Sequence, residues 1–315
     1  MKKKFDAIVV GELNVDLILN QIESFPEVGK EKLADKMTLA LGSSSAIFAS
    51  NLSALGMSVS FIGKTGNDIF GRYIEEQLEA KGVDTSMLMM NDDLQTGATV
   101  ALSFGENRAM ITHQGAMKHL SLKDITKEKL TMAGHLHFSS YFLQPGFTND
   151  LDKLFQLAKE CGLTTSLDVQ WDPGEKWDFD FKKILPFVDV FLPNEAELLN
   201  LTKTDKINSA IQAIEGYGKF MVVKQGNKGS LLWYDGRQVE RPSFLNDKVV
   251  DSIGAGDSFN AGFIYKFIRG FAPEECQTFG NLTGAISTTR SGGTGAFKDY
   301  QTTMEIARDK FGYID

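Results

Sequence analysis

Residues 250–263 read VDSIGAGDSFNAGF, and this stretch constrains the architecture more than any other part of the chain. Its pattern predicts a short strand, a glycine turn and a helix with a carboxylate in its first turn. Because glycine lacks Cβ, Gly254 and Gly256 allow the backbone to turn sharply and to approach a ligand closely. The amides that open a helix have no partner within it, and together with the helix dipole they attract anions.

Asp257 places a carboxylate beside this predicted anion site. The turn Gly254-Ala255-Gly256 and the amides that follow can stabilise negative charge, while the carboxylate can accept a proton from a hydroxyl group. Phosphoryl transfer to an alcohol requires both functions. The alternative interpretation is a plain helix cap, in which Asp257 would contribute about 1 kcal/mol to stability.

The composition is that of an ordinary globular protein and argues against two classes of partner, nucleic acids and membranes. The chain has 315 residues, 42% hydrophobic and 23% charged, with a formal net charge of -8. The acidic balance and the lack of a long basic run argue against nucleic-acid binding. No segment approaches the roughly 20 apolar residues of a membrane-spanning helix. Cys161 and Cys276 are isolated, so we expect free thiols and a cytoplasmic protein that binds neither membranes nor nucleic acids.

Short apolar runs alternate with longer helical patterns along most of the chain. This alternation predicts an α/β protein with a Rossmann-like, doubly wound, mainly parallel sheet. The strands are expected at 5–11, 59–63, 135–139, 164–168, 188–192 and 220–224. The helices are expected at 46–55, 70–81, 151–161 and 281–290, with another beginning at Glu195. A dinucleotide-binding reductase is set aside, because residues 11–16 lack the Gly-x-Gly-x-x-Gly pattern after the first strand.

Two extended segments do not fit this alternation. Residues 12–41 look polar with exposed alternation, and residues 95–113 predict a hairpin about Gly105-Glu106. We expect these segments to form a small β-sheet lid over a core made of residues 1–11, 42–94 and 114–315. The open edges of such a lid favour a homodimer that pairs through it.

Polar residues follow two of the predicted strands. Asn14 and Asp16 lie two positions apart, so in extended backbone they point the same way and suit vicinal hydroxyls. An Asx-type turn is the alternative. Asn194 and Glu197 follow the strand that ends at Leu192, where they fit either a helix cap or oxygen groups near a hydrated Mg²⁺.

The pattern Asp-x-x-Gly-Ala-Gly-Asp-Ser-Phe-x-Ala-Gly-Phe that starts at Asp251 resembles the C-terminal signature of the ribokinase-like (PfkB) carbohydrate kinase family. Gly63, Gly66, Asp68 and Gly71 resemble its N-terminal signature, Gly-x-x-Gly-x-Asp-x-x-Gly. The resemblance extends from the first strand to the last glycine-rich loop.

The resemblance implies an ATP-dependent kinase with Asp257 as general base and an anion hole at Gly254, Ala255 and Gly256. It implies that the sugar-like substrate is held by Asn14, Asp16, Gly42, Ser43 and Asp257. It implies that ATP is bordered by Asn194, Lys224, Gly226, Gly229, Gly256 and Asn281. Asn194 and Glu197 would hold Mg²⁺ through water, and Asp251 would help to hold a monovalent cation such as K⁺.

The chain departs from the family pattern in its predicted acceptor region. Ser43 stands where a second glycine is usual, and Ile47 replaces an asparagine that contacts substrate. Several members of the family carry an Asp-x-Asn-x-Arg motif, and this chain has Gln170 and Asp172 at its last two defined places. An acidic residue in place of the arginine argues against an anionic acceptor. Arg108, in the predicted lid hairpin, is a cation that could bind an anionic acceptor, so this class of acceptor remains an alternative.

The expected function is therefore ATP-dependent phosphorylation of a hydroxyl of a sugar or related small molecule. A nucleoside kinase of the same fold is one alternative. A sugar- or nucleotide-binding protein with weak catalysis is another, and it is motivated by the altered residues Ser43 and Ile47. The sequence leaves the acceptor open among ribose, fructose, a ketogluconate and a nucleoside.

Overall fold

A central eight-stranded sheet organises the chain in the computed structural model, which describes residues 3–104 and 107–314. Its order is β14-β13-β12-β11-β10-β9-β1-β4, and the strands from β12 to β4 are parallel. These strands span Phe5–Val10 (β1), Val59–Ile62 (β4), Ala133–Ser139 (β9), Thr164–Asp168 (β10), Val190–Phe191 (β11), Phe220–Lys224 (β12), Ser230–Tyr234 (β13) and Arg237–Arg241 (β14). The predicted doubly wound α/β architecture is confirmed.

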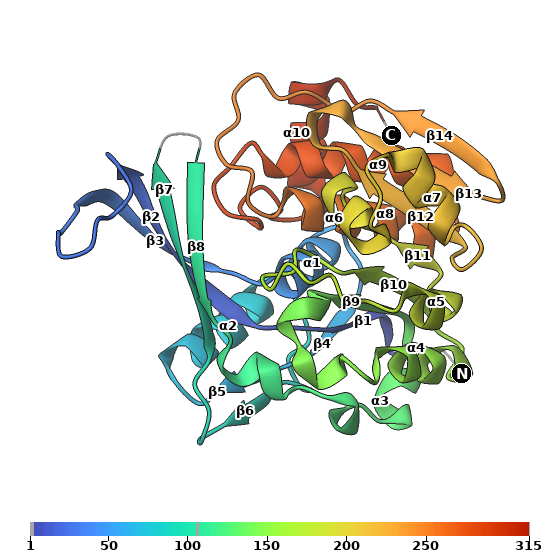
Figure 1. Ribbon diagram of the computed structural model, residues 1–315, viewed down its shortest axis with the longest axis horizontal. Helices are drawn as coiled ribbons and strands as arrows, with labels where there is room; N and C mark the ends of the chain where they lie inside the picture. The colour runs from blue at the N-terminus through green and yellow to red at the C-terminus, as the bar shows by residue number, and fades with distance from the viewer. Residues whose placement is uncertain (1–2, 105–106, 315) are drawn as a thin grey trace.

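Helices cover both faces of this sheet (Figure 1). On one face lie α3 (Lys127–Thr131), α4 (Leu151–Glu160), α5 (Phe181–Ile184), α6 (Glu195–Thr202) and α7 (Ile207–Ile214). On the other lie α1 (Ser44–Ala54), α2 (Ile69–Ala80), α8 (Ala255–Ile268), α9 (Pro273–Ser287) and α10 (Tyr300–Phe311). Short 3-10 segments span Gly115–His119, Leu122–Asp124, Tyr141–Leu143, Pro145–Phe147, Leu185–Phe187 and Gly226–Lys228.

The apolar run of β1 shows why a parallel strand forms here. Successive side chains of a strand point to opposite faces, so a strand that is covered on both sides must be apolar throughout. Ile8 and Val10 pack with the helices of the first face, whereas Ala7 and Val9 pack with those of the second. All four side chains are fully buried.

A separate four-stranded sheet projects from the core, with the order β3-β2-β7-β8 (Figure 1). Its strands are β2 (Asn14–Ile22), β3 (Ala34–Leu41), β7 (Gly97–Phe104) and β8 (Asn107–His113). The predicted small sheet is therefore present, and we call it the lid sheet. The hairpin turn predicted at Gly105-Glu106 lies outside the described residues. A two-stranded parallel sheet joins β5 (Lys64–Gly66) to β6 (Met89–Asn91).

Some predicted boundaries are wrong. The helix expected at 281–290 is α9, which begins at Pro273 and ends at Ser287. Proline is favoured in the first turn of a helix, because its missing amide has no helical partner there, and this signal was overlooked. The strand expected at 188–192 contains only two paired residues, Val190–Phe191, and the helices α7 and α10 were not predicted.

Both cysteines are free, and Cys276 is buried, as expected. Within the described ranges no helix is both long and apolar enough to span a bilayer.

Candidate active site

The turn before α8 has the conformation that its glycines suggested. Gly254 is the residue before the helix and has φ 71°, which favours glycine because a side chain is strained there. A Cβ on Gly254 would also lie 2.5 Å from the Cα of Gly293 and 3.1 Å from Ile47. The turn therefore packs directly against the loop that follows α9.

Asp257 lies in the first turn of α8 and is almost fully buried. Burial, reinforced by the nearby charge of Asp168, raises the pKa of Asp257 to about 7. The simple helix-cap interpretation is wrong, since the cap position belongs to Gly254. A carboxyl that titrates near neutral pH is suited to accepting and returning a proton.

A cavity of about 500 Å³ opens beside Asp257. All six residues predicted to border ATP line it, together with apolar side chains such as Phe244 and Leu245. The predicted residues that the structure brings together here are Asn194, Glu197, Lys224, Gly226, Gly229, Gly254, Ala255, Gly256, Asp257 and Asn281. The lining of the cavity thus combines polar groups at the first turn of α8 with apolar side chains.

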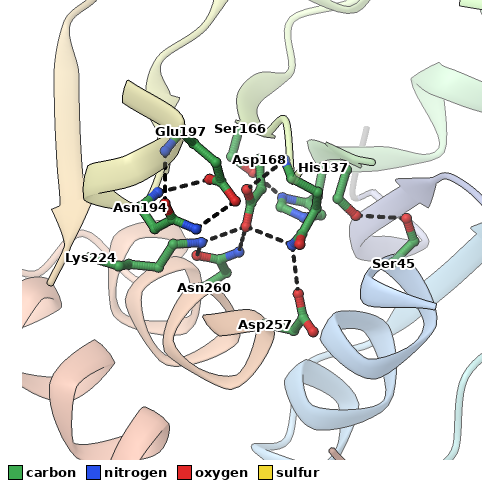
Figure 2. Close-up of polar contacts among 11 residues, drawn as sticks. Ser45, His137, Ser166, Asp168, Asn194, Glu197, Lys224, Asp257 and Asn260 are labelled. Atoms are coloured by element: carbon green, nitrogen blue, oxygen red, sulfur yellow. Dashed lines mark hydrogen bonds and ion pairs between the residues drawn. The ribbon is translucent and has the colours of Figure 1, made fainter. Parts of the chain in front are cut away.

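Asn194 and Glu197 form a reciprocal helix cap at the start of α6 (Figure 2). The backbone and side-chain nitrogens of Asn194 donate to the two carboxylate oxygens of Glu197 at 2.8 and 2.6 Å. Burial, with the charge of Asp168, raises the pKa of Glu197 to about 7. The cap interpretation is therefore correct, and the same two side chains also line the cavity.

Lys224 ends β12 and also lines the cavity, but its ammonium is not free. It lies 2.5 Å from Asp168 Oδ2 in a buried ion pair and 3.3 Å from Asn260 Oδ1 (Figure 2). The nearby loop needs its glycine: Gly229 has φ 106°, and a Cβ there would lie 2.0 Å from the carbonyl oxygen of Arg241.

Asp251 and Asn281 support the loops around the cavity. The Asp251 carboxylate accepts hydrogen bonds from the amides of Ile253 and Gly292, and so ties the segment before α8 to the loop after α9. Asp251 does not line the cavity. Asn281 projects from the middle of α9 and donates to the carbonyl oxygens of Arg241 and Pro242.

The predicted acceptor residues form a second group. Asn14 donates to Asp16 at 2.9 Å and to Thr99 at 3.1 Å, so the two side chains do point the same way. Gly42 packs against both, because a Cβ there would lie 2.5 Å or less from their polar atoms. Burial raises the pKa of Asp16 to about 6. This group begins the lid sheet and lies outside the lining of the large cavity.

The residues that depart from the family pattern have structural partners. Ser43 caps α1 by accepting from the amide of Ala46, and it donates to the carbonyl oxygen of Glu12 at 2.6 Å. It has φ 70°, which explains why glycine is usual at this position. Ile47 lies against Gly254 and Gly293 and so packs against the turn before α8.

A sequence model of the pfkB family carbohydrate kinases matches residues 4–299. The chain belongs to this family. The expectation of an ATP-dependent sugar kinase is thereby confirmed at the level of the family.

Several relatives of this pfkB family member carry more specific names. An uncharacterized sugar kinase of Archaeoglobus fulgidus is 30% identical over 239 residues, 74% of this chain and 92% of its own length. A 5-dehydro-2-deoxygluconokinase of Lacticaseibacillus casei is 26% identical, with 91% of this chain and 90% of the relative covered. The structure of Arabidopsis thaliana ribokinase complexed with ribose and ATP superposes with a TM-score of 0.81 over 96% of this chain and 98% of the ribokinase chain, at 25% sequence identity.

In this pfkB family member, Asp168 is a central residue that the sequence interpretation noted only within a motif. It is fully buried at the end of β10, and it accepts from Lys224 and Asn260 at 2.5 Å each (Figure 2). Its position at the carboxyl end of a parallel strand was an available signal. Asn260 lies one turn after Asp257, so Asp168 ties the start of α8 to the sheet.

Glu12 was also missed. It follows β1, is buried, and its carboxylate accepts from the hydroxyls of Ser45 and Ser140. Burial raises the pKa of Glu12 above its usual value. The pfkB kinase thus holds a second buried acid close enough to Asp257 to raise the pKa of that carboxyl.

Two further motifs of the pfkB kinase have structural roles. The carboxylate of Asp172 is already engaged within its own loop, because it accepts hydrogen bonds from the amides of Gly174, Lys176 and Trp177. His135 and His137 share a buried strand face, and both bond to Ser166.

Proposed function

We propose that this protein transfers the γ-phosphoryl group of ATP to a hydroxyl of a sugar or a closely related small molecule. The observation that carries this proposal is the position of Asp257. Its buried carboxyl lines the large cavity and accepts a hydrogen bond from Ser44, which is two residues after the acceptor residue Gly42. It therefore stands between the two predicted binding regions.

Asp257 acts as the general base. As the acceptor oxygen forms its bond to the γ-phosphorus, the hydroxyl proton passes to the carboxylate and the bond from phosphorus to the bridging oxygen of ATP breaks. The pKa of about 7 suits this role, because a base works best when its pKa lies near the working pH. ADP and the phosphorylated acceptor are the products.

The first turn of α8 stabilises the charge of the transferring group. Ala255 and Gly256 line the cavity beside Asp257, and the amides that open the helix point at its contents. Because these dipoles are fixed by the turn at Gly254, they need no reorganisation during the reaction. The apolar side chains of Phe244, Leu245 and Val249, which also line the cavity, suit the adenine base.

Asn194 and Glu197 fit a hydrated Mg²⁺ better than a directly bound one. Both carboxylate oxygens of Glu197 already accept hydrogen bonds from Asn194, so direct ligation would compete with the helix cap. Mg²⁺ keeps several waters and prefers oxygen partners. When bound, it would neutralise part of the phosphate charge, and these two residues would orient its water shell.

The acceptor is held by Asn14 and Asp16 with Gly42 behind them, and Ser43 completes the wall. The Asp16 carboxylate accepts from hydroxyls, while the polar groups of Asn14 stay oriented by Thr99. Lys224, Gly226, Gly229 and Asn281 border the nucleotide. The lid sheet excludes water that would otherwise hydrolyse ATP.

Three further assignments belong to this proposal. Asp251 helps to hold a K⁺ ion, which would order the loop that its carboxylate already contacts at Gly292. The chain forms a homodimer through the lid sheet, where Met37, Met110 and Ile111 are exposed. The protein works in the cytoplasm, in keeping with its two free cysteines.

An assay of ADP release tests the proposal. The protein is given Mg·ATP and a panel of free sugars, sugar acids, sugar phosphates and nucleosides, with and without K⁺. An acceptor-dependent signal supports the kinase and identifies its acceptor class, and a nucleoside as best acceptor would favour the nucleoside kinase. A flat panel with ATP binding still detected by calorimetry would overturn it in favour of a binding protein.

A further inference from the structure

Gln170 lies between two buried carboxyl groups of the site. Its side-chain nitrogen Nε2 is 3.0 Å from Asp257 Oδ1 and 3.1 Å from Asp168 Oδ2. A side-chain amide carries two hydrogens on this nitrogen, so one NH₂ group can donate to both carboxylates at once. The contact joins β10 to the catalytic turn of α8.

The backbone of Gln170 is held in an unusual conformation to make this contact. Its φ is 61°, in the left-handed region that side chains other than glycine, asparagine and aspartate seldom adopt. The Gln170 amide nitrogen lies 3.3 Å from Asp168 Oδ1, which fixes the turn. Strained conformations persist where the surroundings over-determine them, and they gather at functional sites.

Asp168 supplies a rigid base for this arrangement. It is fully buried and fixed by Lys224 from β12 and Asn260 from α8 (Figure 2). Gln170 is thus anchored through its backbone and side chain to one immobile carboxylate and reaches the second with the same nitrogen. The Asp257 oxygen that it contacts is Oδ1, and the same carboxyl also accepts a hydrogen bond from Ser44.

We propose that Gln170 is a positioning residue that holds the Asp257 carboxyl through Oδ1, in the orientation in which this carboxyl faces the acceptor hydroxyl. The inference rests on the proposed role of Asp257 as base. By donating to both carboxylates, the amide also offsets part of the repulsion through which the charge of Asp168 raises the pKa of Asp257. A carboxylate at position 170 would do the opposite.

The other charged groups around Asp257 come from four elements. Asp168 on β10, Glu12 after β1 and Glu197 on α6 are acidic, and Lys224 on β12 is the cation that opposes them. Because acids outnumber this cation, loss of a neutral donor should favour the protonated form of Asp257.

Two substitutions test the proposal. Gln170→Met keeps the length of the side chain and removes the donor, and Gln170→Glu keeps the shape and adds a third carboxylate. We expect the acidic limb of the kcat/KM profile to move to higher pH in the order wild type, Gln170→Met, Gln170→Glu. If the apparent pKa of this limb rises by one pH unit, kcat/KM falls about tenfold at pH values below that pKa and changes little at pH values above it. The KM for ATP stays within about twofold if only the base is disturbed.

The matched control is Gln156→Glu on the exposed face of α4, the same chemical change at a remote site. It should leave the limb in place. A merely structural role for Gln170 would lower activity equally at every pH, and that result would overturn the proposal.

A second readout does not depend on turnover. Carboxyl-carbon NMR of protein with labelled aspartate follows the titration of Asp257, with its signal assigned through Asp257→Asn. An upward displacement in Gln170→Met supports the proposal even if no acceptor has been found, and an unchanged titration overturns it. Wild-type protein that turns over no acceptor while this displacement is seen would count against the proposed function alone.

Discussion

The side-chain nitrogen of Asn51 donates a 2.9 Å hydrogen bond to the carbonyl oxygen of Gly293, 242 residues later in the chain. The same nitrogen lies 2.9 Å from Ser258 Oγ on α8. Asn51 is fully buried on α1, so one side chain joins α1, α8 and the loop after α9. These three segments are therefore held in fixed positions relative to one another.

Asn51→Ala should lower the free energy of unfolding by about 1–3 kcal/mol, because the buried carbonyl of Gly293 loses its donor. Urea unfolding measures the change. Asn200→Ala is the control, since the side chain of half-buried Asn200 donates to the carbonyl oxygen of Ala196 in the preceding turn of α6. Equal losses in the two variants would show that the Asn51 contacts contribute nothing specific.

Asp257→Asn should reduce kcat by about 10²–10⁴-fold, because the amide cannot accept the acceptor proton. ATP binding, measured by calorimetry, should remain close to wild type. The control is Asp235→Asn, in an exposed turn with φ 48° that asparagine also tolerates. A variant at position 257 with a wild-type rate would remove Asp257 from the role of base.

Asp16→Asn should stabilise the unliganded protein at neutral pH while it weakens acceptor binding. Burial raises the pKa of Asp16 to about 6, so the folded state binds a proton that the unfolded state releases at lower pH. Asp16 therefore does not destabilise the folded state below about pH 4, where it is protonated in both states. Its destabilising effect grows as the pH rises and levels off above about pH 6. Asparagine keeps the bond from Asn14 without the charge.

Urea unfolding at a series of pH values checks this prediction. Asp16→Asn should raise the free energy of unfolding by about 1–3 kcal/mol at pH 7.5, and this increase should vanish near pH 4. Asp93→Asn, at an exposed position, should show no such pH-dependent gain. A gain for Asp16→Asn that is the same at every pH would exclude ionisation as its cause.

Gly254→Ala should lose both stability and turnover. Its φ of 71° alone costs alanine about 1–2 kcal/mol, and the new Cβ would lie 2.5 Å from Gly293 Cα. Gly270→Ala is a close control, because its φ is 78° and no atom lies within 4 Å of the added Cβ. Unfolding of both variants separates conformational strain from the clash. Equal losses, with full activity in Gly254→Ala, would contradict the close packing of the catalytic turn.

Met37→Lys on β3 should give a monomer if the lid sheet forms the dimer. Met37 is 70% exposed, and a charge buried between two copies would be costly. Light scattering coupled to gel filtration measures the mass, and Val28→Lys in the adjacent loop outside the strands is the control. A monomeric wild-type protein would remove the dimer from the proposal.

Much of the core could be predicted because local chemistry and final structure agree there. Gly254 adopts the positive φ that a glycine turn suggested. The parallel strand β1 was recognisable because both of its faces are buried, which requires an uninterrupted apolar run.

The contacts that complete the site were harder to predict because they join distant segments. Lys224 and Asp168 are 56 residues apart, and Gln170 and Asp257 are 87 apart. No local pattern reports that a lysine near a glycine loop is already paired with a buried carboxylate. Asp172 is a different case, because its carboxylate accepts hydrogen bonds from amides of its own loop.

The strand β2 starts at Asn14, so Asn14 and Asp16 belong to the lid sheet, whereas Asp257 belongs to the core. An acceptor that touches all three spans two sheets, and its measured affinity includes the free energy of setting the lid at the right distance. If only a fraction of molecules holds that arrangement, the apparent Kd rises by the inverse of the fraction. Substitutions far out on the lid would then alter acceptor affinity without contacting the acceptor.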